Sequence, residues 1–413
     1  MDDIERIASV LELQNAKRAA ADPVVQGALG TVEDFLKDEE VMCYGGTAIN
    51  NLLPPADRFY NPKTDIPDYD FFSKTPQEHA MRLADKLSAI GIKNVEVKAG
   101  MHLGTFKVYA DFEGVADITH LNKDIFDRLW KEGLEKNGIH YVTPNFLRMS
   151  MYLELSRPKG DVSRWKKVYS RLVLLNKHYP LSCPVAKKEP TPIDDENRTV
   201  IENILLGGDV ILLGLAASQI HEGKRSVKWS APATIMTTQN KIEGLTKGYK
   251  TKVVKGTDIL PSHTDVYDEA GKVFLRIHET AACHSYHRMR SGVRVASIPT
   301  LLQFFFAYMY SGASEDEISE LMCVSQRLMD LAHEKPKRRY ALLTPIDCIG
   351  HQENLVEIRK HKSVLYEKLS KKKTSAEFLQ YFFSYNPKID TTKRNTIREQ
   401  LRKTRKARLD ASY

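Results

Sequence analysis

The chain has no run of apolar residues that approaches the roughly 18 needed for a membrane-spanning helix, so we expect no membrane span. Its first residues, Met1-Asp2-Asp3-Ile4-Glu5, are acidic and lack the apolar segment of a secretory signal. Cysteines are few, odd in number and never arranged as Cys-x-x-Cys: Cys43, Cys183, Cys283, Cys323 and Cys348. This usage predicts a reducing compartment, such as the cytoplasm, and no disulfide framework.

The composition is that of a globular protein: of 413 residues, 42% are apolar and 28% charged, enough for two or three domains. The net charge of +8 favours a polyanionic partner only mildly at this size. Basic residues crowd the last stretch, against Glu399 and Asp410, and include Lys393, Arg394, Arg398, Arg402, Lys403, Arg405, Lys406 and Arg408. Two interpretations of this tail carry equal weight: a solvated terminal segment, and a surface that binds nucleic-acid phosphates.

Asp68 and Asp70, separated by one tyrosine, stand in an apolar segment that follows a Gly45-Gly46-Thr47 turn. Side chains alternate along a strand, so both carboxylates are expected on one face. Neighbouring carboxylates repel unless a cation lies between them, and Mg²⁺ accepts one or two carboxylates together with phosphate oxygens. A glycine turn before a helix offers backbone N–H groups to such phosphates. The combination predicts metal-assisted nucleotidyl transfer.

A third acid on a later strand would complete this site, and the candidates are Asp111 and Asp117. Glu113-Gly114 is expected to form a two-residue hairpin loop. Pairing across this loop places Asp117 opposite Ala110, on the more apolar face, and Asp111 on the face of Lys107. An acid on an apolar face has the greater need of a cation, so Asp117 is the predicted third ligand.

Further nucleotide contacts are predicted on the helix that begins at Pro144, where Arg148 and Tyr152 share a face directed at the base or the triphosphate. Tyr152 suits a core position equally well. Lys166, on a helix that begins near Asp161, could reach a phosphate, and a solvated basic face explains it at least as well. The histidines near Cys283 lack a zinc-binding spacing and are expected to be surface or hydrogen-bonded residues.

The second half of the chain repeats landmarks of the first in the same order, which indicates a duplication. Gly45, Gly114 and Pro144 have counterparts in Gly214, Gly271 and Pro299. The second copy is shorter between its first two landmarks, the interval that holds Asp68 and Asp70 in the first copy. It carries no carboxylate at the matching positions, so we expect it to keep the fold and lack the metal site.

These patterns predict an α+β protein with two tandem copies of a mixed sheet flanked by helices, the second copy degenerate. We expect an N-terminal helical segment over 1–30, a catalytic domain over 31–180, a linker over 181–199, the degenerate domain over 200–385 and a basic tail over 386–413.

A Gly-Gly turn, an acid-x-acid strand and a third acid resemble the polymerase β-like nucleotidyltransferase superfamily. More closely, most of 30–385 resembles the poly(A) polymerase catalytic subunits of poxviruses and giant DNA viruses. The segments that carry this likeness are Pro67-Asp68-Tyr69-Asp70-Phe71-Phe72-Ser73, Asp117-Ile118-Thr119 and Leu147-Arg148-Met149-Ser150-Met151-Tyr152. The resemblance implies two tandem nucleotidyltransferase-like domains and template-independent addition of AMP, from ATP, to an RNA 3′ end.

In that family scheme Asp68 and Asp70 bind the Mg²⁺ (or Mn²⁺) that carries the triphosphate, and with Asp117 they bind the ion that activates the RNA 3′-hydroxyl. Gly45, Gly46 and Thr47 orient the phosphates. The resemblance also implies a homodimer or a processivity partner subunit, and a cytoplasmic site such as a viral factory, or the virion. Two alternatives stay open: another terminal nucleotidyltransferase (uridylyl or CCA-adding), and a catalytically inactive RNA-binding subunit.

Overall fold

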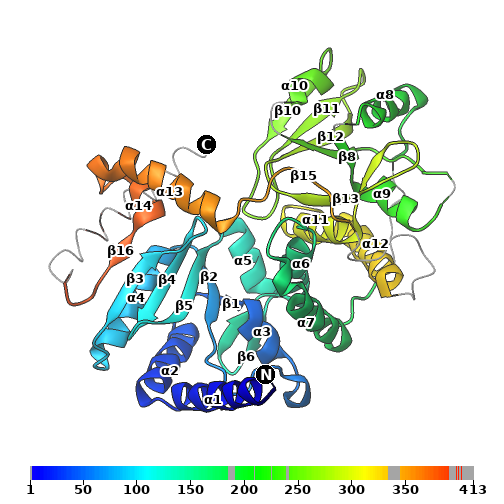
Figure 1. The fold of residues 1–413 in the computed structure, drawn as a ribbon. Coiled ribbons are helices and arrows are strands. Elements are labelled where there is room, and N and C mark those ends of the chain that lie inside the picture. Colours follow the sequence, from blue (N-terminus) through cyan, green and yellow to red (C-terminus); the bar gives the residue numbers. More distant parts are fainter. Residues whose placement is uncertain are drawn as a thin grey trace. The chain divides into compact units, whose positions relative to one another are not determined.

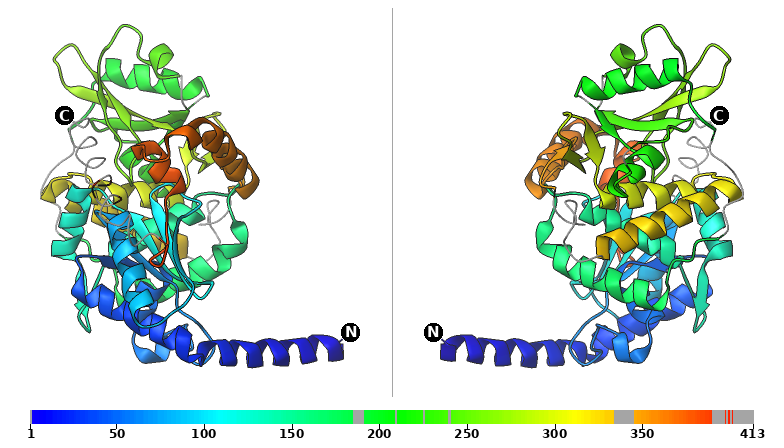
Figure 2. Two further views of the ribbon diagram at one scale, coloured as in Figure 1. Left: turned by 90° about the vertical axis from the view of Figure 1, so that its left-hand side faces the viewer. Right: turned by 90° about the vertical axis from the view of Figure 1, so that its right-hand side faces the viewer.

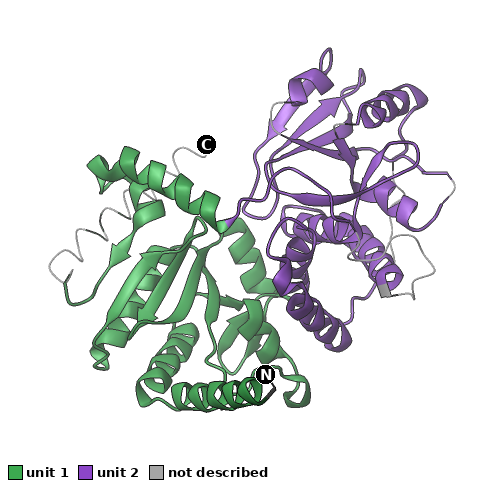
Figure 3. Ribbon diagram, viewed as in Figure 1, with its two compact units in different colours: residues 1–143, 355–413 green, residues 144–354 purple. Residues whose placement is uncertain are grey.

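The computed structural model describes residues 2–184, 191–208, 210–224, 226–238, 241–333, 345–389, 397, 399 and 401. The chain forms two compact units, coloured separately in Figure 3: unit 1 consists of 1–143 and 355–413, and unit 2 of 144–354. This division differs from the expected domain boundaries at 180 and 385. The helices after Thr143 belong to unit 2, and the segment from Leu355 belongs to unit 1.

Unit 1 is built on an eight-stranded mixed sheet with the strand order β16-β3-β4-β5-β2-β1-β7-β6 (Figure 1). Its strands are β1 (Met42–Tyr44), β2 (Tyr69–Ser73), β3 (Val95–Ala99), β4 (Thr105–Ala110), β5 (Glu113–His120), β6 (Leu134–Lys136), β7 (Ile139–Tyr141) and β16 (Ser384–Tyr385). The pairs β2–β5 and β1–β7 are parallel, and the other neighbours are antiparallel.

The helices of unit 1 are α1 (Asp2–Ala20), α2 (Pro23–Asp38), α3 (Gly45–Leu52), α4 (Pro76–Ala89), α5 (Lys123–Glu132), α13 (Leu355–Leu369) and α14 (Ala376–Phe382), with 3₁₀ turns η1 (Pro55–Asp57) and η3 (Ser370–Lys372). Asp22 caps α2 by accepting the Val24 N–H at 2.7 Å, and Pro23 supplies a suitable first residue. The buried face of α2 packs on α4 and β7. Helix α1 extends away from the rest of unit 1 (Figure 2).

The C-terminal segment completes the sheet of unit 1. Strand β16 pairs with the edge strand β3, with Tyr385 opposite Val97. The Tyr385 hydroxyl donates to Asp85 at 2.7 Å, and the Lys362 ammonium group donates to the Gly100 carbonyl at 2.6 Å. This pairing covers an edge that would otherwise expose unpaired backbone groups.

Unit 2 contains a second eight-stranded mixed sheet, in the order β10-β11-β12-β9-β8-β14-β13-β15. Its strands are β8 (Val210–Leu212), β9 (Ala233–Thr238), β10 (Lys250–Val254), β11 (His263–Tyr267), β12 (Val273–Thr280), β13 (His284–Arg288), β14 (Arg294–Ala296) and β15 (Cys348–Ile349). Its helices are α6 (Pro144–Leu155), α7 (Trp165–His178), α8 (Asp195–Leu206), α9 (Gly214–His221), α10 (Ile242–Leu245), α11 (Ile298–Tyr310) and α12 (Glu315–His333), with a 3₁₀ turn η2 (Val162–Arg164).

Strand order and direction agree between the two sheets. The series β3-β4-β5-β2-β1-β7-β6 of unit 1 matches β10-β11-β12-β9-β8-β14-β13 of unit 2, with the same parallel and antiparallel pairs. Both sheets even shift register at the same place, after Val108 in β4 and after Val266 in β11. The expectation of two tandem copies is confirmed.

Two disulfides join cysteines of unit 2, Cys183 to Cys323 and Cys283 to Cys348, and Cys43 is a free, buried thiol. The expectation of no disulfide framework is therefore wrong. An odd count of widely spaced cysteines carries no information about which of them the fold brings together, and here the two pairs are 140 and 65 residues apart. The cysteine count thus gives no support to a reducing compartment.

None of the helices that the structure describes combines the length and the apolar character that crossing a bilayer requires.

Candidate active site

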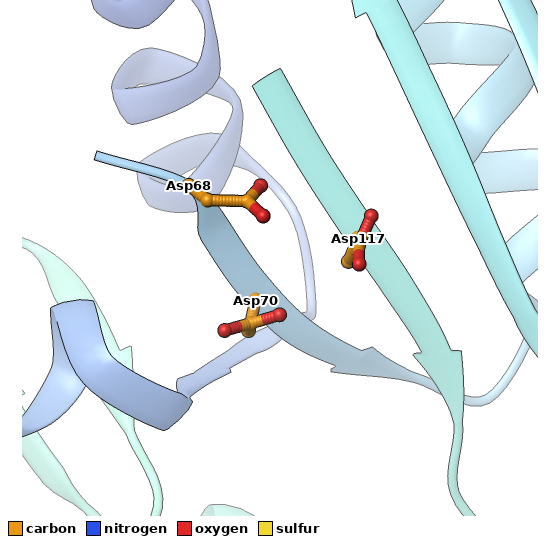
Figure 4. Close-up of side chains that lie close together, drawn as sticks. All are labelled: Asp68, Asp70 and Asp117. Atoms are coloured by element: carbon orange, nitrogen blue, oxygen red, sulfur yellow. The ribbon is translucent and has the colours of Figure 1, made fainter. Parts of the chain in front are cut away.

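Three carboxylates gather on one face of the sheet of unit 1, and Figure 4 shows their side chains close together on two neighbouring strands. Asp70 on β2 and Asp117 on β5 are direct partners in a parallel pair of strands, so their side chains share a face. Asp68 immediately precedes β2, two residues before Asp70. One oxygen from each acid lies within 4.8 Å of the others. Strand pairing thus brings together the three acids predicted from the sequence.

The hairpin between β4 and β5 differs from its expected form. The loop residues are Asp111 and Phe112, both with positive φ (50° and 72°), and Glu113 already belongs to β5. Ala110 pairs with Glu113, so the expected pairing of Ala110 with Asp117 is wrong. Asp111 lies at this turn, and its carboxylate accepts a hydrogen bond from the side-chain amide of Asn94.

The strand partner of Asp117 is Lys107. Its ammonium nitrogen lies 2.6 Å from both carboxylate oxygens of Asp117. Both side chains are partly buried, with 34% of Lys107 and 18% of Asp117 exposed. Burial lowers the pKa of Lys107, but the hydrogen bond and charge of Asp117 outweigh it, and the net shift is upward. Lys107 is therefore a protonated cation fixed against the third acid.

Asp68 shows the electrostatic cost of grouping the acids. Partial desolvation raises the pKa of Asp68, the charge of Asp117 raises it further, and Lys107 only partly offsets these two effects. A carboxylate whose pKa is raised by a second carboxylate is one that a bound cation would stabilise in its ionised form. The three acids are thus incompletely neutralised by Lys107.

The glycine turn lies directly beside the acids. Tyr44, the last residue of β1, pairs with Asp70, and Gly45 follows it with φ of 73° at the start of α3. A Cβ atom at Gly45 would overlap the carboxylate of Asp70. Thr47 is buried in the first turn of α3, and its hydroxyl donates to the backbone oxygen of Asp68 at 2.8 Å. The turn therefore fixes the backbone from which the acids project.

Tyr44 and Lys107 were not singled out in the sequence. The Tyr44 ring stacks on Phe72 with centroids 3.9 Å apart, and its hydroxyl lies 2.9 Å from the hydroxyl oxygen of Thr119. Burial raises the pKa of Tyr44, and the charge of Asp70 adds to the shift, so the phenol stays neutral. Strand alternation alone placed Lys107 on the face of Asp111. The register shift after Val108, which the sequence pattern does not reveal, puts it opposite Asp117.

Two predicted nucleotide contacts lie in unit 2, buried on α6. The Arg148 side chain donates to Asn176 at 2.8 Å, to Asn145 at 2.6 Å and to the Tyr179 carbonyl. Burial lowers the pKa of Arg148 to about 10, and it stays charged at neutral pH. Tyr152 is 1% exposed. The hydrogen bonds of Arg148 and the burial of Tyr152 give both residues a structural role within unit 2, and their contact with a nucleotide stays a prediction.

Lys166 lies exposed on α7 of unit 2, which agrees with either interpretation of its charge. The predicted RNA-binding residues of the tail lie outside the described residues. They are Lys393, Arg394, Arg398, Arg402 and Lys403.

The acids fit a divalent cation of the Mg²⁺ type by donor chemistry and by spacing. Carboxylate oxygens are hard ligands, which suit Mg²⁺ and Mn²⁺ better than thiolates or imidazoles do. Two oxygens bound to one Mg²⁺ lie at most about 4.2 Å apart, since each bond is about 2.1 Å. The spread of 4.8 Å is close to this limit, so small side-chain rotations bring the oxygens to one ion.

Residues 30–161, which contain the three acids and the glycine turn, match the family described as "Poly(A) polymerase catalytic subunit". A protein of African swine fever virus named "Putative poly(A) polymerase catalytic subunit" is 32% identical over 189 residues, 44% of this chain and 38% of that protein. A protein of the same name from Acanthamoeba polyphaga mimivirus is 30% identical over 154 residues, 36% of this chain and 26% of that protein. The chain thus spans under two fifths of the length of these relatives.

The fold resembles that of a solved structure, the crystal structure of the Megavirus polyadenylate synthase. The TM-score is 0.81 at 18% identity, over 97% of this chain and 88% of that one. This likeness confirms the expected fold across both units. The resemblance seen in the sequence motifs is confirmed as well, because residues 30–161 match the family of poly(A) polymerase catalytic subunits.

Proposed function

We propose that this protein adds AMP units from ATP to RNA 3′ ends without a template, as a poly(A) polymerase. The observation that carries the proposal is the convergence of Asp68, Asp70 and Asp117 beside the Gly45 turn. The family of residues 30–161 selects polyadenylation among the reactions that such a site could perform. The substrates, ATP and an RNA 3′ end, follow from that family and belong to the proposal.

Mg²⁺ or Mn²⁺, held by the three carboxylates, would supply charge stabilisation at the reacting oxygens and lower the pKa of the attacking hydroxyl. The protein's own contribution is positioning. Thr47 ties the backbone of Asp68 to α3, and Lys107 holds Asp117 through both of its oxygens. The N-terminus of α3 at Gly45 would offer backbone N–H groups to a triphosphate. Arg148, Tyr152 and Lys166 are kept as proposed nucleotide contacts.

A primer-extension gel tests the activity. The purified protein is incubated with Mg²⁺, a short labelled RNA and ATP, GTP, CTP or UTP singly, beside the Asp68→Ala/Asp70→Ala variant. We expect a long ladder with ATP alone that is absent with the variant. Extension with UTP or CTP instead would point to a uridylyl or CCA-adding enzyme, and no extension with any nucleotide would point to an RNA-binding subunit.

A matched pair of variants tests the third acid, since both candidates can be changed to an amide of the same shape. Asp117→Asn should lower the rate more than about 100-fold, because even indirect partners of a metal cost 10–100-fold when they are removed. Asp111→Asn should leave the rate within about twofold, since asparagine tolerates the positive φ at that turn. The reverse ranking would reject Asp117 as the third ligand.

The same proposal includes a homodimer or a processivity partner subunit, and a location in the cytoplasm, a viral factory or the virion.

It also includes binding of RNA by the basic C-terminal segment. If this segment binds RNA phosphates, deleting residues 391–413 should shorten the poly(A) products made at moderate salt and weaken the dependence of their length on salt concentration. If the length of the poly(A) products and its salt dependence stay unchanged, the basic C-terminal segment is a solvated terminal segment that does not bind RNA.

A further inference from the structure

The degenerate sheet of unit 2 keeps a cavity at the position of the catalytic acids. The register makes the correspondence residue by residue. Asp70 and Asp117 are partners in the parallel pair β2–β5, and Thr234 and Arg276 are partners in the matching pair β9–β12. Leu213 donates its N–H to the Thr234 carbonyl directly before the turn into α9, as Tyr44 pairs with Asp70 before α3. Arg276 thus occupies the position of the third acid.

The neighbouring strand completes an exchange of charge. Asp117 faces Lys107 across β4–β5, and Arg276 faces Asp265 across β11–β12. The Arg276 Nε donates to Oδ1 of Asp265 at 2.8 Å, and Nη2 donates to Oδ2 at 3.3 Å. The acid and the base of the catalytic copy have traded places. The position that would help to bind a cation in unit 1 is therefore occupied by a positively charged side chain in unit 2.

The glycine turn is retained beside this pair. Gly214 begins α9 with φ of 66°, and a Cβ atom there would come within 3.2 Å of Thr234, as one at Gly45 would meet Asp70. At the positions of Asp70 and Asp117 the second copy has no carboxylate. A divalent cation thus has no anionic ligand from these two positions, and the positive charge of Arg276 opposes its approach.

A cavity of about 550 Å³ opens onto these residues. Its volume lies in the range of small-molecule sites, about 300–1,000 Å³. Gly214, Thr234 and Arg276 line it, together with Ser230, the exposed Lys255 and the carboxylates of Asp265, Glu317 and Glu320. Hydroxyls, a guanidinium, an ammonium group and the N-terminus of a helix are the groups that bind phosphate in proteins.

The Arg276 guanidinium is held ready for an anion. It carries five N–H donors, and the bonds to Asp265 and to the Tyr308 hydroxyl fix its plane. Of the Arg276 side chain, 27% stays exposed, so an occupant of the cavity can reach it. Asp265 is also approached by His263, whose Nε2 lies 3.6 Å from Oδ1.

Aromatic and aliphatic side chains line the same cavity. Phe305 and Tyr308 of α11 line it with Leu260 and Leu321. Tyr308 is held by hydrogen bonds to His278 and Arg276, so its ring has a fixed orientation. Aromatic side chains and cationic, hydroxyl-bearing groups in one cavity match the base and the phosphate of a nucleotide.

We propose that this cavity of unit 2 binds a nucleoside phosphate without a metal ion, with Arg276 at the phosphate and the Phe305–Tyr308 wall at the base. The nucleoside phosphate can be free ATP or one nucleotide of an RNA chain. The site is separate from the proposed catalytic site and does not depend on the activity of that site.

The test uses the full chain carrying Asp68→Ala and Asp70→Ala, in EDTA, so that the first site and any metal contribute nothing. ATP binding is measured by calorimetry, and binding of a fluorescent oligoadenylate by polarisation. We expect saturable binding of at least one of the two, and the one that binds identifies the source. Binding of neither, or binding that requires Mg²⁺, would overturn the proposal.

Variants locate the binding. Arg276→Gln should weaken it about tenfold or more through loss of a charge-assisted contact. Arg276→Gln/Asp265→Asn should weaken it similarly while leaving no unpaired buried carboxylate, and circular dichroism checks that each variant is folded. Arg198→Gln is the control, because Arg198 makes an exposed ion pair with Glu202 on α8 of the same unit. Equal affinity of the Arg276 variants and the control would reject the cavity, and displacement by pyrophosphate as effective as by ATP would reject the base-binding wall.

Discussion

Lys107 and Asp117 face each other across β4 and β5, and the lysine nitrogen lies 2.6 Å from both carboxylate oxygens. A protein cation therefore partly neutralises the acids at the place where we propose that a divalent cation binds. The same pair of strand positions carries Asp265 and Arg276 in unit 2. Both copies thus carry one acid and one base at these two positions. The residue on β5 or β12 faces the site, so the site has a carboxylate in unit 1 and a guanidinium in unit 2.

Replacing Lys107 by methionine should make the thermal stability of the protein depend more strongly on a divalent cation. Without Lys107 the three acids repel one another, and we expect a loss of about 1–2 kcal/mol in metal-free stability, between the values of exposed and buried pairs. Added Mg²⁺ should then raise the melting temperature more than it does in the parent protein. The control is Lys98→Met, because Lys98 forms an exposed pair with Glu96 on the adjacent strand. Equal gains from Mg²⁺ in both variants would contradict the proposed metal site.

Gly45→Ala should abolish transfer at a small cost in stability. The new methyl group would overlap the Asp70 carboxylate, and φ of 73° adds strain of about 1–2 kcal/mol. Gly91→Ala is a matched control, since Gly91 has φ of 95° and no heavy atom within 4 Å of an added Cβ. Primer extension and thermal melting separate the two effects. Comparable activity of the two variants would show that the Gly45 turn does not position Asp70 for catalysis.

Acid should destabilise unit 1 partly through His79. Burial, together with the charges of Arg82 and Lys74, lowers the pKa of His79 to about 3. The unfolded chain then binds more protons than the folded one between pH of about 3 and 6.5, so stability rises with pH across this window and is lost as pH falls below about 6.5.

The effect of His79 is measured by chemical denaturation at pH 7 and pH 5. This one residue should contribute on the order of 1–2 kcal/mol to the loss at pH 5. His79→Gln should show a correspondingly smaller loss between the two pH values, whereas His102→Gln, at an exposed position, should behave as the parent. Parallel pH profiles for all three proteins would refute the assignment.

The two disulfides of unit 2 predict the thiol content of the protein. Under denaturing conditions without reductant, one thiol, that of Cys43, should react, and after reduction all five should react. Reduction should also lower the stability of unit 2 by about 2–5 kcal/mol for each bond. Five reactive thiols before reduction would show that these pairs are not formed in the purified protein.

Local patterns in the chain were sufficient for the parts of the site that lie close together in sequence. Two acids at i and i+2 in an apolar segment, after a Gly-Gly turn, are read from alternation and turn chemistry alone, and the structure brings them to one face. The presence of a second copy followed from repeated landmarks, and the matching strand orders confirm it.

Contacts between segments far apart in the chain could not be predicted from local sequence patterns. The partner of Asp117 depends on which two residues turn the β4–β5 hairpin and on the register shift after Val108. The turn lies two residues earlier than expected, and together with this shift it replaces Ala110 by Lys107. The pairing of β16 with β3 and the two disulfides join segments far apart in the chain, for which no periodicity exists.

The amino-acid sequence by itself determined which acids gather at the candidate site and the two-copy plan, because alternation along strands and the order of landmarks are properties of neighbouring residues. Only the tertiary structure decided that Lys107 neutralises Asp117, that the C-terminal segment belongs to unit 1, and that Arg276 replaces the third acid in unit 2. The physical reason is that strand register and cross-strand charge pairs are fixed by packing between segments, which a linear pattern does not encode.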